Sequence, residues 1–417
     1  MSTVEIRTLD ESDVAAWLRA LWIGFHRVPA VGAAEVPLRR RGLDLGRTQG
    51  AFEAGRCVAT FRSMPRELTV PGGGTVAASA VTNVSVSSTH RRRGLASRMM
   101  AADLAAAKTR GDAVAILIAA EYPIYGRFGF GPATWVTQWE VDVPRAGVDR
   151  RYAGPEDGGR VDIADLDEVR KFGPGLHERV RARTAGAINR LPQWWEVATG
   201  ALDFPSQPWK EPFFIVYRDA DGQIDGLAAY DITDHVWAGK LPRVDAMVRQ
   251  LIAATPAAER ALWRHLLSMD WITQVKSGFR APDDILPLLL GDPRAARTET
   301  NADYMWLRLL DTPVALSART YAGGPAALVL DVRDDDALAG GRFQLETDAS
   351  GAARCTPTTA AADLTLAAAD LACLYLGDES AVRLATLGRL TEHRQGAAGA
   401  ADTLFRTPRR PWCIDVF

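Results

Sequence analysis

Hydrophobic and polar positions follow two periods in the first 150 residues, and these periods predict an alternation of strands and helices. Residues 4–8 alternate apolar and polar side chains, which indicates a strand, whereas residues 14–21 place apolar side chains at helical spacing. Four further strand patterns occupy 51–53, 57–62, 67–70 and 77–86, and they are followed by a helix at 94–109 and by strands at 113–120 and 135–143. This order predicts a three-layered α/β domain over residues 1–148.

The central region, 149–310, follows a loop rich in Arg, Gly and Pro at 144–160. We expect strands at 213–218 and 223–233, and helices at 163–184, 243–252 and 256–268. This mixture is similar to that of the first region, and we interpret it as a degenerate internal duplication.

A third region, 311–417, begins at Asp311-Thr312-Pro313 and is predicted to be an α+β domain. Strand patterns lie at 327–333 and 342–347, an Ala-rich segment at 359–375 and a helical pattern at 379–390. The final residues, 408–417, are unusually apolar for a chain end, because termini are normally polar and frayed. We therefore expect the tail to be docked onto the protein.

Composition narrows the function classes. The formal net charge of −2 predicts no general attraction to nucleic acid. Four cysteines, Cys57, Cys355, Cys373 and Cys413, form no C-x-x-C pair, so neither a metal site nor a disulfide framework is expected. The N-terminal residues do not look like a signal peptide, and no run of about 20 apolar residues occurs. These observations predict a cytoplasmic protein without a membrane partner.

The stretch from Val84 to Ser97 carries the most specific signal. A strand leads into a turn with Arg91, Arg92 and Arg93, and the turn leads into a helix. Three arginines are unfavourable at a helix N-terminus, which already carries partial positive charge, unless an anion binds there. A pyrophosphate would satisfy the arginines, the helix dipole and the free backbone N–H groups together, and the alternative is a solvated basic turn.

The pattern Arg91-x-x-Gly94-x-Ala96 matches the acyl-CoA pyrophosphate motif of the GNAT acetyltransferase superfamily. With the run Ile124-Tyr125-Gly126-Arg127-Phe128-Gly129-Phe130-Gly131-Pro132-Ala133, the chain resembles the enhanced-intracellular-survival (Eis) family. The resemblance covers the whole chain. It implies an N-terminal GNAT domain, a central GNAT-like domain that lacks the cofactor motif, and a C-terminal domain like a sterol carrier protein.

The resemblance also implies the site residues. Acetyl-CoA would be held by three segments, namely the strand Val84, Ser85 and Val86, the turn and helix start Arg92, Arg93, Gly94, Leu95, Ala96 and Ser97, and the position Ala120 and Glu121. Tyr125 would be the general acid, and the C-terminal carboxylate of Phe417 the general base. The glycines at 126, 129 and 131 suggest that backbone approaches closely around Tyr125. An ordinary aromatic at Tyr125 and a hydrophobic plug at Phe417 are the alternatives.

The chemistry requires such groups. An amine with a pKa of about 10 must lose a proton before it attacks a thioester, and a carboxylate can accept that proton. A backbone N–H can stabilise the oxyanion, and a phenol can protonate the departing thiolate. Phe25, His26 and Asp415 are candidate substrate contacts.

The family resemblance implies acetylation of aminoglycosides at several positions, acetylation of lysine side chains, and a homohexamer built as a trimer of dimers. The competing interpretation is a scaffold protein that keeps the fold and binds an apolar ligand in its third domain.

Overall fold

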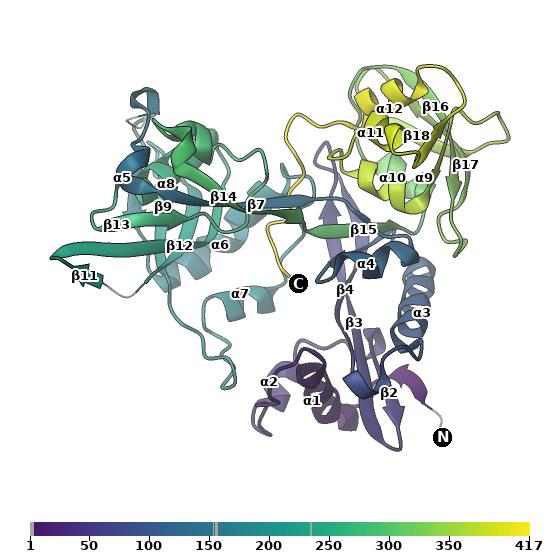
Figure 1. Ribbon diagram of the computed structural model, residues 1–417, viewed down its shortest axis with the longest axis horizontal. Helices are drawn as coiled ribbons and strands as arrows, with labels where there is room; N and C mark the ends of the chain where they lie inside the picture. The colour runs from purple at the N-terminus through teal and green to yellow at the C-terminus, as the bar shows by residue number, and fades with distance from the viewer. Residues whose placement is uncertain (1–3, 153, 155–156, 234–235) are drawn as a thin grey trace.

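The computed structural model describes residues 4–152, 154, 157–233 and 236–417, which form three sheets with their own helices (Figure 1). Residues 153, 155 and 156 of the predicted linker lie outside the described residues. The mixed α/β architecture agrees with the predicted fold class.

The first sheet has seven strands in the order β1-β2-β3-β4-β5-β15-β6. These are β1 (Glu5–Thr8), β2 (Thr48–Glu53), β3 (Arg56–Thr69), β4 (Thr75–Val86), β5 (Val114–Ile118), β15 (Met305–Leu309) and β6 (Gly131–Pro132). Two predicted strands are one long strand, β3, because Pro65 does not interrupt it. The pairing of β3 with β2 stops at Arg62, so Pro65 lies where β3 needs no donor toward β2.

Two helices cover opposite faces of this sheet, α1 (Val14–Gly24) and α3 (Leu95–Arg110) (Figure 1). The indole of Trp17 on α1 donates to the carbonyl of Gln49 on β2 at 2.9 Å. The side-chain amide of Gln49 donates to the carbonyl of Met99 on α3 at 3.2 Å. Separate apolar clusters form beneath the two helices, and for α1 the helical spacing of its apolar residues predicted this.

The second sheet has eight strands, in the order β14-β7-β13-β12-β10-β9-β8 with β11 paired to β12. These are β14 (Ala296–Asp303), β7 (Trp135–Asp142), β13 (Ile272–Lys276), β12 (Leu241–Ala253), β10 (Ile224–Ile232), β9 (Phe213–Arg218), β8 (Arg160–Ile163) and β11 (Val236–Ala238). The prediction of a helix at 243–252 was wrong. Val244, Ala246 and Val248 alternate in the sequence and are buried on one face of β12.

The sheets do not follow the linear division of the chain at residue 148. β7 was assigned to the first region but pairs with β13 and β14 in the second sheet. β15 was assigned to the central region but lies between β5 and β6 in the first sheet. The first sheet therefore contains a strand from the central region, β15, and the second sheet contains a strand from the first region, β7.

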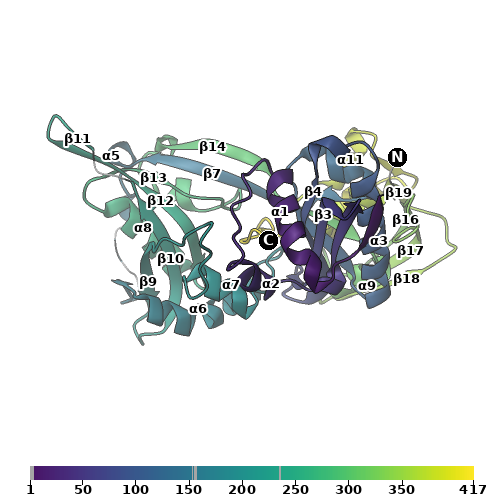
Figure 2. The same ribbon diagram turned by 90° about the horizontal axis from the view of Figure 1, so that it is seen from below.

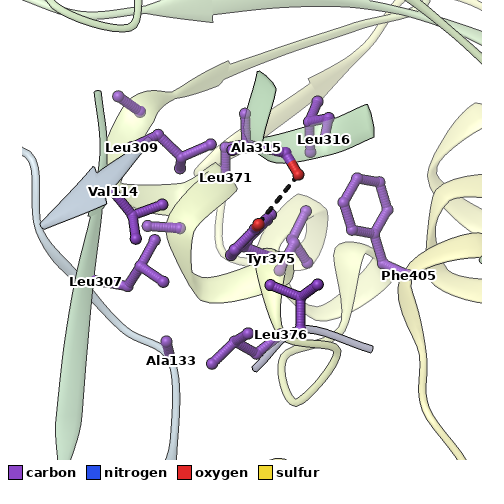
Figure 3. Packing of buried hydrophobic residues seen from close by; sticks show 14 of the residues in the cluster. Val114, Ala133, Leu307, Leu309, Ala315, Leu316, Leu371, Tyr375, Leu376 and Phe405 are labelled. Atoms are coloured by element: carbon purple, nitrogen blue, oxygen red, sulfur yellow. Dashed lines mark hydrogen bonds between the residues drawn. The ribbon is translucent and has the colours of Figure 1, made fainter. Parts of the chain in front are cut away.

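The third sheet has five strands in the order β18-β17-β16-β19-β20. These are β18 (Ala353–Pro357), β17 (Gly341–Thr347), β16 (Ala326–Arg333), β19 (Leu364–Ala367) and β20 (Leu390–Glu392). Its helices pack on the first sheet through a shared core that includes Val114, Leu307, Leu371 and Tyr375 (Figure 3). The Tyr375 hydroxyl donates to the carbonyl of Ala315 at 3.0 Å, so this buried polar group is satisfied (Figure 3).

The remaining helices are α2 (Val36–Arg40), α4 (Tyr122–Tyr125), α5 (Val143–Ala146), α6 (Leu166–Arg181), α7 (Pro192–Ala198), α8 (Pro256–Ser268), α9 (Thr312–Ala318), α10 (Ala368–Tyr375), α11 (Ala381–Thr386) and α12 (Ala397–Phe405).

The C-terminal tail is docked, as the apolar pattern of 408–417 predicted, and it leaves the third domain and ends between the other two (Figures 1 and 2). Trp412 and Cys413 are buried, and the backbone N–H of Trp412 donates to the carbonyl of Ala185 at 2.8 Å. The tail thus brings the last residue of the chain to the junction of the first and central domains.

Candidate acetyl-CoA site and acceptor pocket

Strands β4 and β5 are parallel neighbours whose pairing stops before the carboxyl end of β4. Their pairing runs from Ala78 and Val114 to Val81 and Leu117, and β4 continues to Val86 without β5 beside it. The carboxyl ends of parallel strands are where open α/β sheets bind ligands. The opening therefore provides a place for an extended ligand along residues 82–86.

A β-bulge in β4 leaves part of its backbone without a strand partner. The register with β3 passes from Thr60↔Ser85 to Arg62↔Thr82, so it skips Asn83 and Val84. Asn83 has a left-handed φ of 54°, and its carbonyl accepts a hydrogen bond from the Thr60 hydroxyl at 2.8 Å. Val84 belongs to neither the β3 nor the β5 register, so its backbone groups can meet a ligand.

The arginine turn lies exposed at the N-terminus of α3. Arg92 and Gly94 have positive φ values of 62° and 73°, and no side chain caps the helix at Gly94. The carboxylate of Glu53 holds the turn, at 2.8 Å from His90 Nε2 and 3.4 Å from a guanidinium nitrogen of Arg93. An exposed, uncapped helix start beside three arginines fits a polyanion such as pyrophosphate.

The remaining residues of the predicted cofactor contact, at the start of α3, are less exposed than the arginines. The side chain of Leu95 is buried in the core, whereas Ala96 and Ser97 are half-buried. Gly94 needs its glycine because of the left-handed φ, and an added Cβ there would meet no atom within 4 Å.

Across the opening, β5 leads to Ala120, Glu121 and Tyr125. Ala120 and Glu121 are exposed, and Tyr125 ends the short helix α4, with its ring 6.3 Å from that of Phe130. Burial, and to a lesser extent the charge of Glu121, raises the pKa of the Tyr125 hydroxyl. This phenol therefore keeps its proton at neutral pH, as a proton donor must.

The glycines near Tyr125 serve packing. An added Cβ on Gly131 would lie 2.1 Å from the carbonyl oxygen of Ala369 on α10. Gly129 has a φ of 73°, and its added Cβ would lie 2.4 Å from the buried guanidinium of Arg308. The close approach expected from the spacing is therefore made by the third domain and by Arg308.

A cavity of about 860 Å³ lies between the first and central domains. Its lining includes Thr82 and Asn83 beside the bulge, Trp17 on α1, Trp194 on α7, and Phe417 at the chain end. The cavity thus brings the last residue of the chain to the bulged part of β4, where the cofactor is expected.

Two of the predicted substrate contacts follow α1. Gly24 packs so closely on β4 that an added Cβ would lie 2.2 Å from Ser85 Oγ. Phe25 and His26 come next in the chain and are exposed, Phe25 at 46%. Neither is among the described residues that line the cavity.

Asp415 has a different position from that expected of a substrate contact. Its carboxylate is buried and accepts hydrogen bonds from Arg190, with an N–O distance of 2.8 Å, and lies 3.6 Å from His177 Nε2. Its charge is used to hold the tail. Sequence reasoning missed Arg190, because its partner Asp415 lies in a distant segment of the chain. It also missed Arg62 and Arg66, whose place in the cavity lining depends on the tertiary fold.

Within the described ranges, no group of three or more His, Cys, Asp or Glu side chains is placed to hold a metal ion. None of the helices in the same ranges is long and apolar enough to cross a membrane.

Comparison with known proteins assigns all three domains to known families. Family models described as acetyltransferase (GNAT) domains match residues 5–133 and 186–309, and a sterol carrier protein domain matches residues 312–414. An uncharacterized N-acetyltransferase of Streptomyces griseus subsp. griseus is 58% identical over the full length of both chains. N-acetyltransferase Eis of Mycobacterium tuberculosis is 36% identical over 86% of this chain and 87% of its own.

Among solved structures, Eis1 from Mycobacterium abscessus superposes with a TM-score of 0.85 at 32% identity, covering all of both chains. The chain therefore belongs to the Eis-like GNAT N-acetyltransferases, with two GNAT domains followed by a sterol carrier protein domain.

Proposed function

We propose that this protein acetylates a primary amine directly from acetyl-CoA, with the cofactor held in the opening between β4 and β5. The observation that carries this proposal is the divergence of the two strands next to the uncapped, arginine-bearing start of α3. Arg92, Arg93 and the backbone from Gly94 to Ser97 would hold the pyrophosphate, and Val84, Ser85, Val86, Ala120 and Glu121 the pantetheine arm. Acetyl-CoA supplies an activated acetyl group as a thioester.

Two groups of the chain carry out the proton transfers, and a backbone N–H stabilises the oxyanion. The terminal carboxylate of Phe417, which lies at the cavity that reaches β4, accepts a proton from the ammonium group of the acceptor, and the resulting neutral amine attacks the thioester carbonyl. The backbone N–H of Val84, at the bulge outside both strand registers, stabilises the negative charge on the carbonyl oxygen. As the carbon–sulfur bond breaks, the Tyr125 hydroxyl donates its proton to the leaving sulfur. The nitrogen loses its second proton to solvent, which reprotonates the phenolate, so that an amide and free CoA are the products.

Aminoglycosides and lysine side chains are the candidate acceptors that the family resemblance implies. Phe25 and His26 are candidate contacts for the acceptor outside the cavity. The homohexamer is part of the same proposal, and light scattering coupled to size exclusion tests it. A mass of about six protomers supports it.

The test of the function is release of CoA thiol from acetyl-CoA with a panel of amines, combined with mass spectrometry that counts acetyl groups on each product. Amine-dependent thiol release with matching acetylation supports the proposal. CoA binding without turnover on any amine contradicts it and favours the scaffold interpretation.

A further inference from the structure

The cavity of about 860 Å³ between the first and central domains, called the acceptor cavity below, is lined mostly by positive charges. Arg39, Arg41, Arg62 and Arg66 contribute to the lining, and Asp44 and the carboxylate of Phe417 supply the negative charges. Two of the arginines are already neutralised, because Arg39 is hydrogen-bonded to Glu35 at 2.5 Å and Arg41 lies 3.2 Å from Glu196. The other two therefore decide the character of the pocket.

Arg62 and Arg66 lie on the same face of β3, four residues apart, on the side that bears Met64 and faces away from α3. Arg62 donates to the carbonyl of Gly42, and Arg66 donates to the carbonyl of Pro65 and to Met64 Sδ. No carboxylate of the described chain lies within 4 Å of either guanidinium. Both cations are thus held by neutral acceptors.

This arrangement is costly for the protein alone. Arg62 Nε is buried and has no hydrogen-bond partner in the described chain. Burial, with a smaller contribution from the charge of Arg66, lowers the pKa of Arg62 to about 10, and burial also lowers that of Arg66. A half-buried cation with an unused donor needs a physical explanation, and a ligand that supplies the counter-charge provides one.

The nearby carboxylates do not supply that counter-charge. Asp415 is committed to Arg190, and Asp44 is exposed and uses an oxygen to accept from the backbone N–H of Gly46 at 3.0 Å. The terminal carboxylate is the proposed base. A polycation entering this cavity would meet two unpaired arginines and few free negative charges.

Resting on the function proposed above, we infer that the preferred acceptor is an amine that also carries an oxyanion, a carboxylate or a phosphate, which Arg62 and Arg66 bind. The guanidinium groups can bind either oxyanion through paired hydrogen bonds. Trp17, Leu18 and Leu21 on α1, with Trp194 opposite, provide apolar walls for the part of the acceptor between its amine and its anion. The two arginines hold the anionic end of the acceptor, and the amine at its other end meets the terminal carboxylate.

Matched acceptors test this inference without changing the reacting amine. We would compare kcat/KM for 6-aminohexanoate, 6-aminohexanamide and 6-aminohexyl phosphate, which carry similar amines and differ at the far end. At least one oxyanion should raise kcat/KM about tenfold or more over the neutral amide, as charge-assisted contacts do. The preferred oxyanion then separates carboxylate from phosphate, and kanamycin serves as the polycationic comparison.

Variants locate the effect. Arg62→Gln with Arg66→Gln should bring the anion-to-amide ratio close to one while turnover of the amide persists, and Arg66→Gln alone should lower it if the double variant is unstable. Arg333→Gln is the matched control, because Arg333 is an exposed arginine of β16 with 72% of its side chain accessible. Its ratio should stay at the wild-type value.

Equal kcat/KM for anionic and neutral acceptors, or a clear preference for kanamycin, overturns the inference. An anion-to-amide ratio of kcat/KM that stays at the wild-type value in the double variant also overturns it. Absence of turnover on every amine would contradict the proposed function, and the inference is then decided by calorimetry, in which 6-aminohexanoate or 6-aminohexyl phosphate must bind more tightly than 6-aminohexanamide.

Discussion

The buried pair of Arg190 and Asp415 should control whether the C-terminal tail stays docked. Both side chains are almost fully buried, with 2% and 3% of their surfaces exposed, and the closest N–O distance is 2.8 Å. Loss of one partner from a buried pair costs about 3–5 kcal/mol, because a charge remains buried without compensation. Asp415→Asn keeps one acceptor oxygen, so we expect the lower end, about 3 kcal/mol.

That energy corresponds to roughly a hundredfold larger population of detached tail. The upstream anchor, where Arg410 lies 2.5 Å from Asp378, keeps the opening local to the last residues. Carboxypeptidase digestion measures the population, because removal of Phe417 follows the open fraction when reclosing is fast. Mass spectrometry should show Phe417 released about a hundredfold faster from Asp415→Asn, together with a lower kcat.

The matched control is Asp335→Asn, which makes the same chemical change on an exposed loop of the third domain. It should release Phe417 at the wild-type rate. If Asp415→Asn is digested no faster than this control, the pair does not hold the tail, and the account of how Phe417 reaches the cavity is refuted.

Three further predictions concern catalysis and one concerns domain packing. Tyr125→Phe should lower kcat by about 10²-fold or more with little change in KM for acetyl-CoA, because a general acid is lost, and steady-state thiol release measures both. One glycine added after Phe417 moves the terminal carboxylate and should lower kcat similarly; normal kinetics would exclude that carboxylate as base. Arg92→Ala with Arg93→Ala should raise KM for acetyl-CoA about tenfold or more at unchanged kcat, whereas an unchanged KM would place the pyrophosphate elsewhere. Gly131→Ala should lower the melting temperature, because its Cβ would lie 2.1 Å from a backbone oxygen of α10, and a wild-type melting curve would contradict that contact.

Local patterns were sufficient for the elements that build the cofactor side. The spacing of apolar residues located α1, and the run of arginines before Gly94 located the turn that the structure leaves exposed at the start of α3. β12 was misread as a helix because its carboxyl end, Leu251 and Ile252, places two apolar residues in succession and hides the alternation that begins at Val244.

The acceptor side depends on distant segments and could not be read from local patterns. The cavity combines α1, β3, the central domain near Trp194 and the final residues of the chain. Asp415 looked like a free acid in the sequence because its partner, Arg190, lies 225 positions away. An ion pair that forms only through tertiary contacts produces no periodic pattern in the sequence.

The position of β15 has a consequence for synthesis on the ribosome. β5 ends at Ile118 and its neighbour β15 begins at Met305, so 186 residues are made between them. At typical rates of 5–20 residues per second, the edge of β5 waits roughly 10–40 s for its partner. A nascent chain with an open apolar edge strand invites pairing with other chains, so we expect this protein to need chaperone shielding during that interval, and a fragment that stops at residue 148 to aggregate.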